Sequence, residues 1–312
     1  MPFLLKRLIS AVSLVLATSL IIFLLLSPSF DDIARNVLGE SASAEQVEQL
    51  TAELGYDRPI FVQYADWLLS ALRGDLGNSL FTPQTVWDAI AVRMPVTVAL
   101  VVLVTLLSGL LGFAVGVVSA VKRGWLDRTL QVFTTLGDAL PAFIIALLLV
   151  TVFAIQLGWL PATGYTAFTI NPAAWAFGLL LPVAALTIPA VAGVGQQVRS
   201  SMIATLRQDY VRTLRSRGLT ETRVVLAHVL RNASTTGLTA LAVQVVGILG
   251  GAVVIEQIFA LPGLGSMAVE ASVRGDVPLV LGAVLAYVVI VVIVNLLVDL
   301  AVAWLNPKVR LS

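Results

Sequence analysis

The sequence contains no cysteine, and its single histidine is His228. The lack of thiols excludes disulfides, thiolate metal sites and catalysis by a thiol nucleophile. One histidine argues against a histidine-based metal centre. Charged residues are also scarce, at 12% of the 312 residues, whereas soluble domains carry about a quarter. With 58% hydrophobic residues and a mean hydropathy of +0.97, the composition predicts an all-α polytopic membrane protein.

A second absence concerns nucleotide binding. The sequence contains no Gly-x-x-x-x-Gly-Lys-Ser/Thr phosphate loop, and the glycines within residues 247–251 lie in an apolar stretch with no lysine after them. If ATP drives this protein, the nucleotide must therefore bind another chain. No arrangement of serine, histidine and carboxylate indicates an active site either, so the sequence predicts a protein that is not itself an enzyme.

Six stretches are apolar over enough residues to cross a bilayer as helices, which takes about 20 residues. They are residues 8–26, 95–121, 129–157, 176–198, 234–255 and 277–304. We expect Pro141 to kink the third span, and Pro182 and Pro189 to break the fourth, because proline lacks the N–H that a helix interior uses. The first stretch is interpreted as a span rather than a cleaved signal peptide, since residues 27–29 offer no Ala-x-Ala site.

The distribution of positive charge predicts the orientation of these spans. Fourteen of the 19 lysines and arginines fall on one side, and seven of them are arginines of one loop. Because loops rich in Lys and Arg stay inside, both termini and this loop are predicted to be cytoplasmic. The expected parts are a tail and first span (1–26), an extracytoplasmic segment (27–94), a five-helix core (95–304) that includes the cytoplasmic loop (199–233), and a tail (305–312).

The extracytoplasmic segment is acidic and is predicted to hold two amphipathic helices. Ser43 and Gln46 have the spacing of a capping box, and the helix that follows would stop at Gly55, which adopts a left-handed conformation at low cost. A second helix is expected over residues 60–72. By themselves these patterns indicate only a surface segment with two helices.

The cytoplasmic loop is the longest polar interruption of the chain and is predicted to form a helix, a turn and a helix. Tyr210, Val211 and Leu214 share one apolar face of the first helix. Gly218 suits its end, and Thr220 suits the N-cap of the second. Three functions fit such a basic element: a loop that only fixes orientation, a nucleic-acid-binding motif, or a contact whose apolar ridge docks into a groove on another protein. The position between two spans argues against nucleic acid.

Two parts of this loop, residues 210–218 and 226–233, resemble the "EAA loop" of ABC-importer membrane subunits. The resemblance is to the dipeptide/oligopeptide/nickel permease family, of the type paired first in its operon. Residues 212–214 stand where the general pattern has Glu-Ala-Ala, and Gly218 keeps the place of its glycine. Four further stretches resemble the family in the expected order: residues 54–79, 137–143, 158–165 and 256–265.

The resemblance implies a type I ABC importer permease fold with six transmembrane helices, working by alternating access. In that family the loop carries a coupling helix that docks on the ATP-binding subunit. The residues expected to make this ATPase contact are Asp209, Tyr210, Arg212, Thr213, Leu214, Arg215, Arg217, Gly218 and Leu219.

The resemblance also implies the partners and the location of the chain. The partners would be a homologous second permease, two ATP-binding subunits (separate or fused), an extracytoplasmic solute-binding protein and membrane lipid, but no nucleic acid. This chain would bind no cofactor, because ATP and Mg²⁺ would bind the partner subunits. The complex would lie in the bacterial cell membrane, which this chain crosses several times.

Polar residues within the spans are candidates for the translocation path, because polar groups at this depth are costly in lipid and face protein or water. They are Asp138, Gln196 and Gln197. Asp138 equally fits an interhelical hydrogen bond. A Glu-x-x-Phe-x-x-Pro-Gly-x-Gly stretch resembles the family's signature and suits an outer gate or a contact with the binding protein, although a plain surface loop also explains it. Its residues are Glu256, Phe259, Pro262, Gly263 and Gly265.

A function of another class is also open: a stand-alone secondary transporter driven by an ion gradient, with Asp138 in a coupling-ion site. Such folds often contain internal repeats, and none is visible in this sequence. The sequence leaves the solute open among dipeptides, longer peptides, nickel chelates, glutathione and haem-like compounds.

Overall fold

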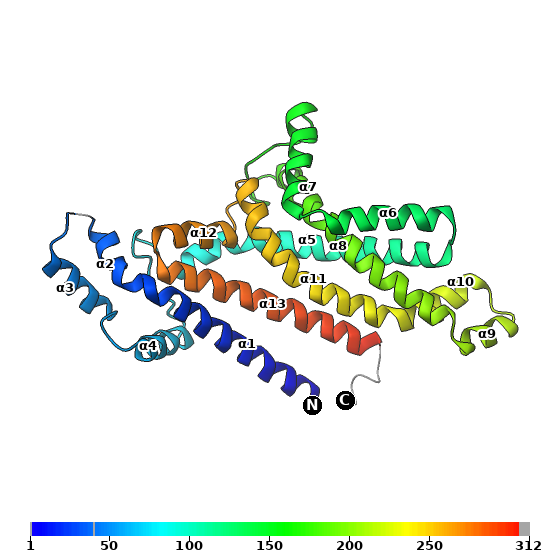
Figure 1. Cartoon of the computed structure of the whole chain (residues 1–312), viewed down its shortest axis with the longest axis horizontal. Coiled ribbons are helices and arrows are strands. Elements are labelled where there is room, and N and C mark those ends of the chain that lie inside the picture. The colour runs from blue at the N-terminus through cyan, green and yellow to red at the C-terminus, as the bar shows by residue number, and fades with distance from the viewer. Residues whose placement is uncertain (1, 40, 306–312) are drawn as a thin grey trace. The chain divides into compact units, whose positions relative to one another are not determined.

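The computed structural model describes residues 2–39 and 41–305, and these are helical with short connections (Figure 1). Within these residues the only strand-like pairing is an isolated antiparallel bridge between Asn78 and Thr85. The chain divides into two compact units. Unit 1 comprises Met1–Thr97 and Pro262–Ile290, and unit 2 comprises Val98–Leu261 and Val291–Ser312.

Five stretches in the described part of the chain are long and apolar enough to cross a membrane: Ile9–Ser29, Val86–Val121, Pro172–Leu206, Glu221–Ile258 and Val277–Val298. The first stretch covers most of α1 (Pro2–Leu26) and the short helix η1 (Ser27–Ser29) that follows it, and the fourth covers α10 (Glu221–Arg223), η3 (Val224–Val229) and α11 (Leu230–Ile258). The other three lie in α5 (Val86–Val121), α8 (Pro172–Leu206) and α13 (Val277–Leu305). A sixth candidate is a bent pair, so all six predicted spans have a counterpart. Of the predicted cytoplasmic tail, residues 305–312, only Leu305 is described, as the last residue of α13; residues 306–312 lie outside the described residues.

The bent pair is the predicted third span. Helix α6 (Trp125–Ala139) and the segment formed by α7 (Ala142–Leu149) and η2 (Val150–Gln156) meet at 102°. Leu140, which precedes Pro141, has an extended backbone with ψ of +124°, as expected because a proline disfavours the helical conformation of the residue before it. The predicted kink at Pro141 is confirmed.

The prediction that two prolines break the fourth span is wrong. Helix α8 continues through both Pro182 and Pro189 for 35 residues. It packs against α6, α7 and α11, and Leu181, Leu186 and Ala190 on its surface are buried. Packing on several neighbours therefore holds the helix through positions where the local preference is to stop.

Unit 1 contains the segment that is predicted to be extracytoplasmic, and the two helices expected within it are confirmed. Helix α3 (Ala44–Leu54) begins with a capping box, in which Gln46 N–H donates to Ser43 Oγ and Ser43 N–H to Gln46 Oε1, at 3.2 and 3.0 Å. It ends at Gly55, with φ of +72°. Helix α4 covers Ile60–Leu72.

The other helices of unit 1 are α1, η1, α2 (Phe30–Leu38), which the sequence did not predict, α12 (Leu264–Arg274), and parts of α5 and α13. Its aromatic core centres on Phe23 and Phe30, whose ring centroids are 5.4 Å apart, and on Val277 and Leu281 of α13. The core joins chain segments that are more than 200 residues apart, and it fixes α4 against the start of α13.

Unit 2 is organised around α8 and depends on close helix contacts. A Cβ atom placed on Gly112 would lie 2.8 Å from Val194 Cβ, and one on Gly116 would lie 2.6 Å from Val198 Cβ. Both distances are too short for real atoms, so α5 and α8 approach here because α5 carries glycine at this spacing. Gly237 of α11 likewise leaves room for the ring of Phe113.

Candidate functional site

The predicted cytoplasmic loop forms one end of unit 2. Helix α8 ends at Leu206, the short helix α9 (Asp209–Ser216) follows, and the chain turns into α10 and η3, which continue as α11 (Figure 1). The predicted helix, turn and helix is thus confirmed. The second helix begins as a π-helix over Val224–Val229, a departure from α geometry that the sequence pattern does not predict.

The apolar face of α9 packs inward. Val211 is fully buried, and Tyr210 and Leu214 pack against a core that contains Met202. The Tyr210 hydroxyl also accepts a hydrogen bond of 2.8 Å from Asn232 Nδ2. The ridge that was expected to dock into another protein is therefore occupied by the chain itself. It joins α9 rigidly to α8 and α11.

The turn after α9 depends on Gly218, which has φ of +81°. Its N–H donates to Arg215 O at 2.9 Å, and the Leu219 N–H donates to Leu214 O at 3.3 Å. Leu219 also packs on the core of unit 2. Thr220 occupies the N-cap position of α10, as predicted, but its side chain makes no capping bond.

An ion pair closes this turn. Arg215 donates twice to Glu221, from Nε to Oε2 at 2.9 Å and from NH2 to Oε1 at 2.6 Å. The hydrogen bonds that Arg215 donates to this carboxylate raise the pKa of the guanidinium above its usual value. Both side chains are about half exposed, at 45% and 53%. The forked geometry fixes Arg215 across the turn while leaving it accessible.

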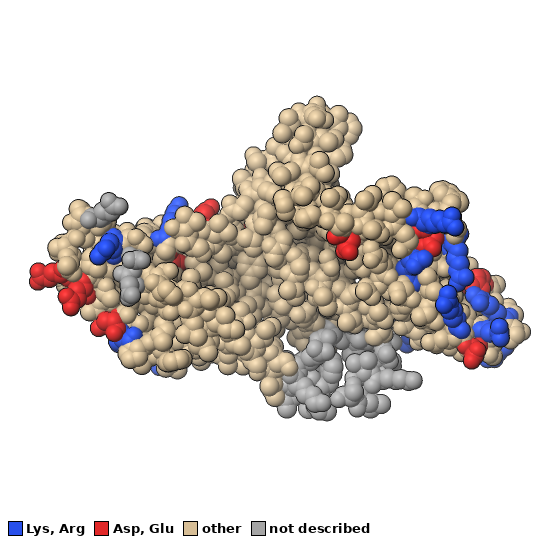
Figure 2. Space-filling model, in the orientation of Figure 1, with Lys and Arg blue, Asp and Glu red and all other residues tan. Residues whose placement is uncertain are grey.

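The outer face of the loop is polar and exposed. Of the expected contact residues, the structure exposes Asp209, Arg212, Thr213, Arg215, Arg217 and Gly218. Figure 2 shows lysine and arginine side chains gathered over this end of unit 2. The exposed basic residues of α9, its neighbours and the α5–α6 turn are Lys122, Arg123, Arg128, Arg207, Arg212, Arg215, Arg217, Arg223 and Arg231. A surface of this kind favours an acidic partner.

Arg199 differs from the other arginines because it points into the unit. Its Nε and NH2 donate to Asp127 Oδ1 and Oδ2 at 2.8 and 2.7 Å. Ser119 of α5 donates to the same carboxylate. The side chains of Arg199 and Asp127 are only 26% and 16% exposed. This network ties α8 to α5 and α6 just before the loop.

An apolar hollow of about 240 Å³ lies beside α10 in the same unit. It is lined by Val118 and Val121 of α5, by Lys122, which follows α5, and by Val225 and Leu226 of η3. Leu226 is 55% exposed. The loop thus offers a small apolar depression beside its arginines, in place of the ridge that the sequence predicted.

The structure brings Asp138 close to α8 and α11. A Cβ atom on Gly193 would lie 4.0 Å from Asp138 Oδ1 and 3.3 Å from Gln244 Oε1. Gln196 and Gln197 follow Gly193 at the spacing of one helical turn, so they lie on the same side of α8. Asp138 and Gln197 are exposed in this chain and Gln196 is half-buried. These residues form one polar strip along unit 2.

The predicted outer-gate residues are mostly enclosed. Glu256 and Phe259 are buried at the end of α11 in unit 2, whereas Gly263 and Gly265 are buried at the start of α12 in unit 1 and Pro262 is exposed. In this conformation four of the five are therefore inaccessible to a binding protein. Irregular backbone does separate α11 from α12, as the proline and glycines indicated.

Three features of the site were missed by sequence reasoning. The Arg199–Asp127 pair joins residues 72 positions apart, so no local sequence pattern predicts it. The place of Gln244 in the polar strip could not be predicted, because the sequence does not show which residues of other helices lie next to its amide. The Arg215–Glu221 pair had a signal, a basic and an acidic residue flanking Gly218, but its spacing fits no single helix.

Two family models match the chain. The model described as "Binding-protein-dependent transport system inner membrane component" matches residues 110–311. The model for the N-terminal part of the same kind of membrane component matches residues 1–101. Together they account for nearly the whole chain.

Relatives with similar sequences match from end to end. A putative peptide transport system permease protein of Brucella abortus is 38% identical over 307 residues, covering 98% of both chains. A probable peptide ABC transporter permease protein of Sinorhizobium fredii is 34% identical over 309 residues, covering 99% of both. The glutathione transport system permease protein GsiC of Escherichia coli is 33% identical over 309 residues, covering 99% of this chain and 98% of the relative.

Solved structures share the fold at low sequence identity. An inward-facing structure of the MetNI methionine ABC transporter matches with a TM-score of 0.54 and 17% identity, covering 70% of this chain and 96% of that chain. An amino acid ABC transporter matches with a TM-score of 0.51 and 18% identity, covering 75% and 96%.

Proposed function

Because this chain belongs to the family of binding-protein-dependent transport system inner membrane components, we propose that it forms half of a path by which short peptides are imported. It is the membrane-spanning permease subunit of an ATP-driven importer, and ATP hydrolysis takes place on other subunits. Relatives named for peptides and for glutathione, itself a short peptide, support this solute class.

The proposed complex contains four further kinds of component. A homologous second permease completes the path, two ATP-binding subunits hold ATP and Mg²⁺ on the cytoplasmic side, and an extracytoplasmic solute-binding protein delivers the peptide. Membrane lipid surrounds the spans. No metal or nucleotide is assigned to this chain, in which the described residues contain no group of three or more His, Cys, Asp or Glu placed to hold a metal ion.

The observation that carries the proposal is the two-sided construction of α9. Its apolar side is fixed on the core of unit 2 through Val211, and its polar side presents Arg212 and Arg217 to solvent. A push from an ATP-binding subunit on those arginines would therefore move α8 and α11, not only the loop. Arginine suits such a contact because its planar fork binds carboxylates and carbonyls in a fixed geometry.

Movement of α8 would reach the polar strip of Asp138, Gln196 and Gln244. Helices α6, α8 and α11 converge at this strip. We assign the strip to the translocation path, where the amide and carboxylate groups offer hydrogen bonds to a peptide backbone in place of water. The Arg199–Asp127 pair lies between the strip and the loop along α8, and it would make α5 and α6 move with α8.

The absence of cysteine in the chain allows a direct test of the docking surface. A single cysteine introduced by Thr213→Cys on the exposed side of α9, and labelled with a thiol-reactive photoactivatable cross-linker, is expected to link to an ATP-binding subunit when the purified complex is irradiated. The matched control is Ser201→Cys with the same label, at a half-buried position of α8 whose hydroxyl donates to Thr236 Oγ1 of α11. A Thr213→Cys variant that stays unlinked in an assembled complex, while the control links, would place the docking surface elsewhere.

Solute class is tested separately in proteoliposomes that contain the whole complex and its binding protein. ATP-dependent uptake of radiolabelled di- and tripeptides is expected, with free amino acids as the comparison. Uptake that proceeds without ATP would instead support the secondary transporter. A complex that hydrolyses ATP but takes up no peptide would contradict the solute class alone.

A further inference from the structure

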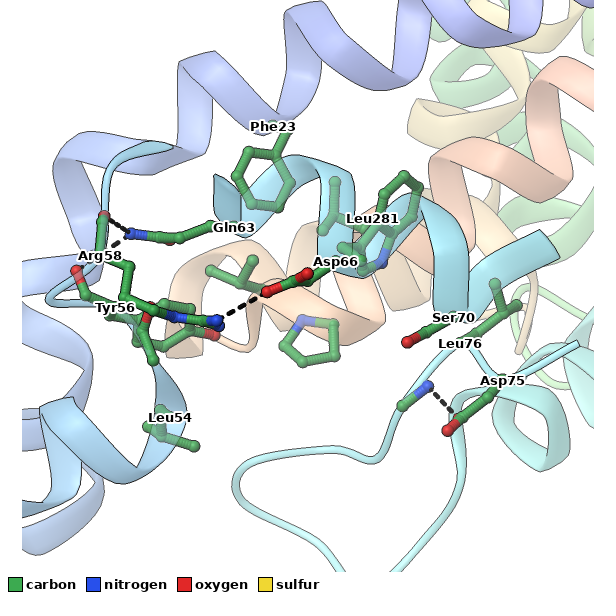
Figure 3. Close-up of a pocket in the computed structure, with 15 residues that line it drawn as sticks. Phe23, Leu54, Tyr56, Arg58, Gln63, Asp66, Ser70, Asp75, Leu76 and Leu281 are labelled. Atoms are coloured by element: carbon green, nitrogen blue, oxygen red, sulfur yellow. Dashed lines mark hydrogen bonds and ion pairs between the residues drawn. The ribbon is translucent and has the colours of Figure 1, made fainter. Parts of the chain in front are cut away.

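Unit 1 contains a cavity of about 270 Å³ that none of the functions above uses. The cavity lies among α1, α4, the turn after α3 and the start of α13 (Figure 3). Its size is close to the lower end of the range for small-molecule sites. It is lined by Phe23, Leu54, Gly55, Tyr56, Arg58, Gln63, Asp66, Trp67, Ser70, Asp75, Leu76, Gly77, Val277, Pro278 and Leu281.

One part of the cavity lining is aromatic, since it includes Phe23 and Trp67. Behind these two rings lies Tyr64, and the centroids of the three rings are 5.5 to 6.2 Å apart. Burial raises the pKa of Tyr56 to about 12, and the nearby Asp276 carboxylate adds to the shift. The Tyr56 phenol is therefore neutral under ordinary conditions, which leaves three charged side chains in the lining.

Those charged side chains lie on two sides of the cavity. Figure 3 shows Arg58 and Asp66 on one side and Ser70 and Asp75 on the other. Arg58 is held in place, because Nε donates to Gly55 O at 3.3 Å and NH1 donates to Asp66 Oδ2 at 2.7 Å. These two bonds use two of the five N–H donors of a guanidinium. No other described residue accepts a hydrogen bond from Arg58, so its remaining donors are available.

Asp75 offers the complementary acceptor. Its Oδ1 accepts from the Gly77 N–H at 2.8 Å, which orients the carboxylate, and within the described residues nothing donates to its Oδ2. Asp75 is exposed and Ser70 is half-buried, so both can be reached from solvent. One end of the cavity thus has free N–H donors on the Arg58 guanidinium, and the other has a free acceptor oxygen on the Asp75 carboxylate.

The charge pattern decides between ligand classes. An anion would satisfy Arg58 but would face two carboxylates, and a simple cation would satisfy Asp75 and leave the donors of Arg58 unused. A neutral apolar molecule would desolvate these groups without replacing their hydrogen bonds, which is costly. A molecule with an ammonium group at one end, a carboxylate at the other and an apolar side chain satisfies both ends and the aromatic wall.

We infer that this cavity binds a short peptide with free termini, its carboxylate on Arg58, its ammonium group on Asp75 and an apolar side chain against Phe23 and Trp67. The cavity itself indicates a zwitterionic molecule with an apolar side chain. The inference rests on the proposed function only in identifying that molecule as a peptide. A lipid headgroup with an amine and a phosphate shares the chemistry. Unit 1 would then hold a peptide on the permease itself, in the segment predicted to face outside.

Binding is measured by titrating alanyl-phenylalanine into the purified complex without its binding protein. The N-acetylated and the C-terminally amidated dipeptides are the matched probes. Each is expected to bind about tenfold more weakly than the free dipeptide, because each loses one charge-assisted hydrogen-bonded contact. Equal affinity of the free and blocked dipeptides, or no saturable binding of any of them, would overturn the inference.

Variants assign the two ends. Asp75→Asn is expected to remove most of the penalty for N-acetylation while keeping the penalty for amidation, and Arg58→Gln is expected to do the reverse. The controls are Glu48→Gln and Arg73→Gln, exposed residues of the same segment outside the cavity lining. They should leave both penalties unchanged. Loss of both penalties in a control variant would show that the binding site lies elsewhere.

Two further arms separate the lipid and the proposed function from this inference. Nanodiscs that contain phosphatidylethanolamine are expected to give the same dipeptide affinity as nanodiscs of phosphatidylcholine alone; competition by phosphatidylethanolamine would assign the cavity to lipid and overturn the inference. ATP-driven peptide uptake is measured on the same preparation with the binding protein added. If the complex takes up peptide but its affinity for the dipeptide does not depend on free termini, the cavity site alone is refuted. If the complex binds the free dipeptide more tightly than the blocked ones but takes up no peptide, the proposed function alone is refuted.

Discussion

The predicted cytoplasmic loop of unit 2 and the cavity of unit 1 each contain an exposed pair of an arginine and a carboxylate. Arg215 and Glu221 are 45% and 53% exposed, and Arg58 and Asp66 are 47% and 51% exposed. The first pair lies on a turn backed by a filled core, and the second lies at the mouth of a hollow lined with aromatic rings. The same pair of groups can therefore brace a contact surface or offer donors to a ligand, depending on what lies behind it.

The comparison also shows where stability is concentrated. Exposed ion pairs contribute about 0–1 kcal/mol each, so neither pair holds its unit together. The loop is fixed by buried groups such as Val211, and the cavity by the packing of Phe23 against Phe30. Variants that change buried groups should thus act on one unit at a time, and variants of the exposed pairs should act on function.

The largest effect is expected from Val211→Asp. Val211 is fully buried on the core of unit 2, and an unpaired carboxylate there should cost about 3–5 kcal/mol. Helix α9 should detach, so that the thermal stability of the complex falls and ATP hydrolysis no longer drives uptake. Dipeptide binding by unit 1 should remain.

Thr213→Asp provides the control, because Thr213 is exposed on the same helix. Its effect on stability should stay within about 0.5 kcal/mol. If Val211→Asp also abolished dipeptide binding in an assembled complex, the two regions would not be independent.

Asp127→Asn should have the next largest effect. Asp127 accepts two hydrogen bonds from Arg199 and a third from Ser119, and hydrogen bonds to charged groups contribute about 1.5–3 kcal/mol. We expect a loss of stability in this range, measured by chemical or thermal unfolding of unit 2.

A double-mutant cycle with Arg199→Gln tests whether the loss comes from this pair. The double variant should be less destabilised than the sum of the single variants, because removing both partners leaves no uncompensated charge. Additive losses would mean that each residue acts through other neighbours.

A smaller effect is expected from Gly218→Val. The left-handed conformation of Gly218 costs other residues about 1–2 kcal/mol, and a β-branched residue tolerates it least. A Cβ atom there would meet no other atom within 4 Å, so the strain is confined to the backbone of the turn. The complex should assemble, but the amount of peptide taken up per ATP hydrolysed should fall.

Gly218→Asn separates conformation from size, because asparagine adopts the left-handed region more readily. Uptake per ATP in this variant should lie close to that of the unchanged protein. If Val and Asn had equal effects, the conformation of the turn would not matter for coupling.

The sequence predicted those parts of both regions that depend on local pattern. The capping box at Ser43, the end of α3 at Gly55, the end of α9 near Gly218 and the kink at Pro141 all follow from a few neighbouring residues, and all are confirmed. Resemblance to a family added a prediction of the loop's role, which local pattern left open among three functions.

What could not be predicted depends on contacts between distant residues. The apolar face of α9 was recognisable, but whether it packs on its own chain or on another depends on α8 and α11. The same holds for α8, which continues through Pro182 and Pro189 because of its neighbours. The cavity is formed by residues more than 200 positions apart, such as Tyr56 and Leu281, so no pattern in the sequence indicates it.

Only a small effect on stability is expected from exchanging the charges of the loop pair, in the double variant Arg215→Glu, Glu221→Arg. The exchanged pair can re-form across the turn at Gly218, so the stability of unit 2 should change by less than about 1 kcal/mol, and salt should weaken the pair in both proteins. Arg215 also belongs to the exposed basic surface, and the exchange removes its fork from the helix that should contact the ATP-binding subunit. Peptide-stimulated ATP hydrolysis should therefore fall although unit 2 stays folded.

Exchanging Arg58 and Asp66 in the same way provides the comparison. The affinity of the cavity for the dipeptide should drop, while the coupling of peptide uptake to ATP hydrolysis stays unchanged. If the loop exchange left ATP hydrolysis intact, Arg215 would act only within its own chain, and the loop pair would have no role in contacting another subunit.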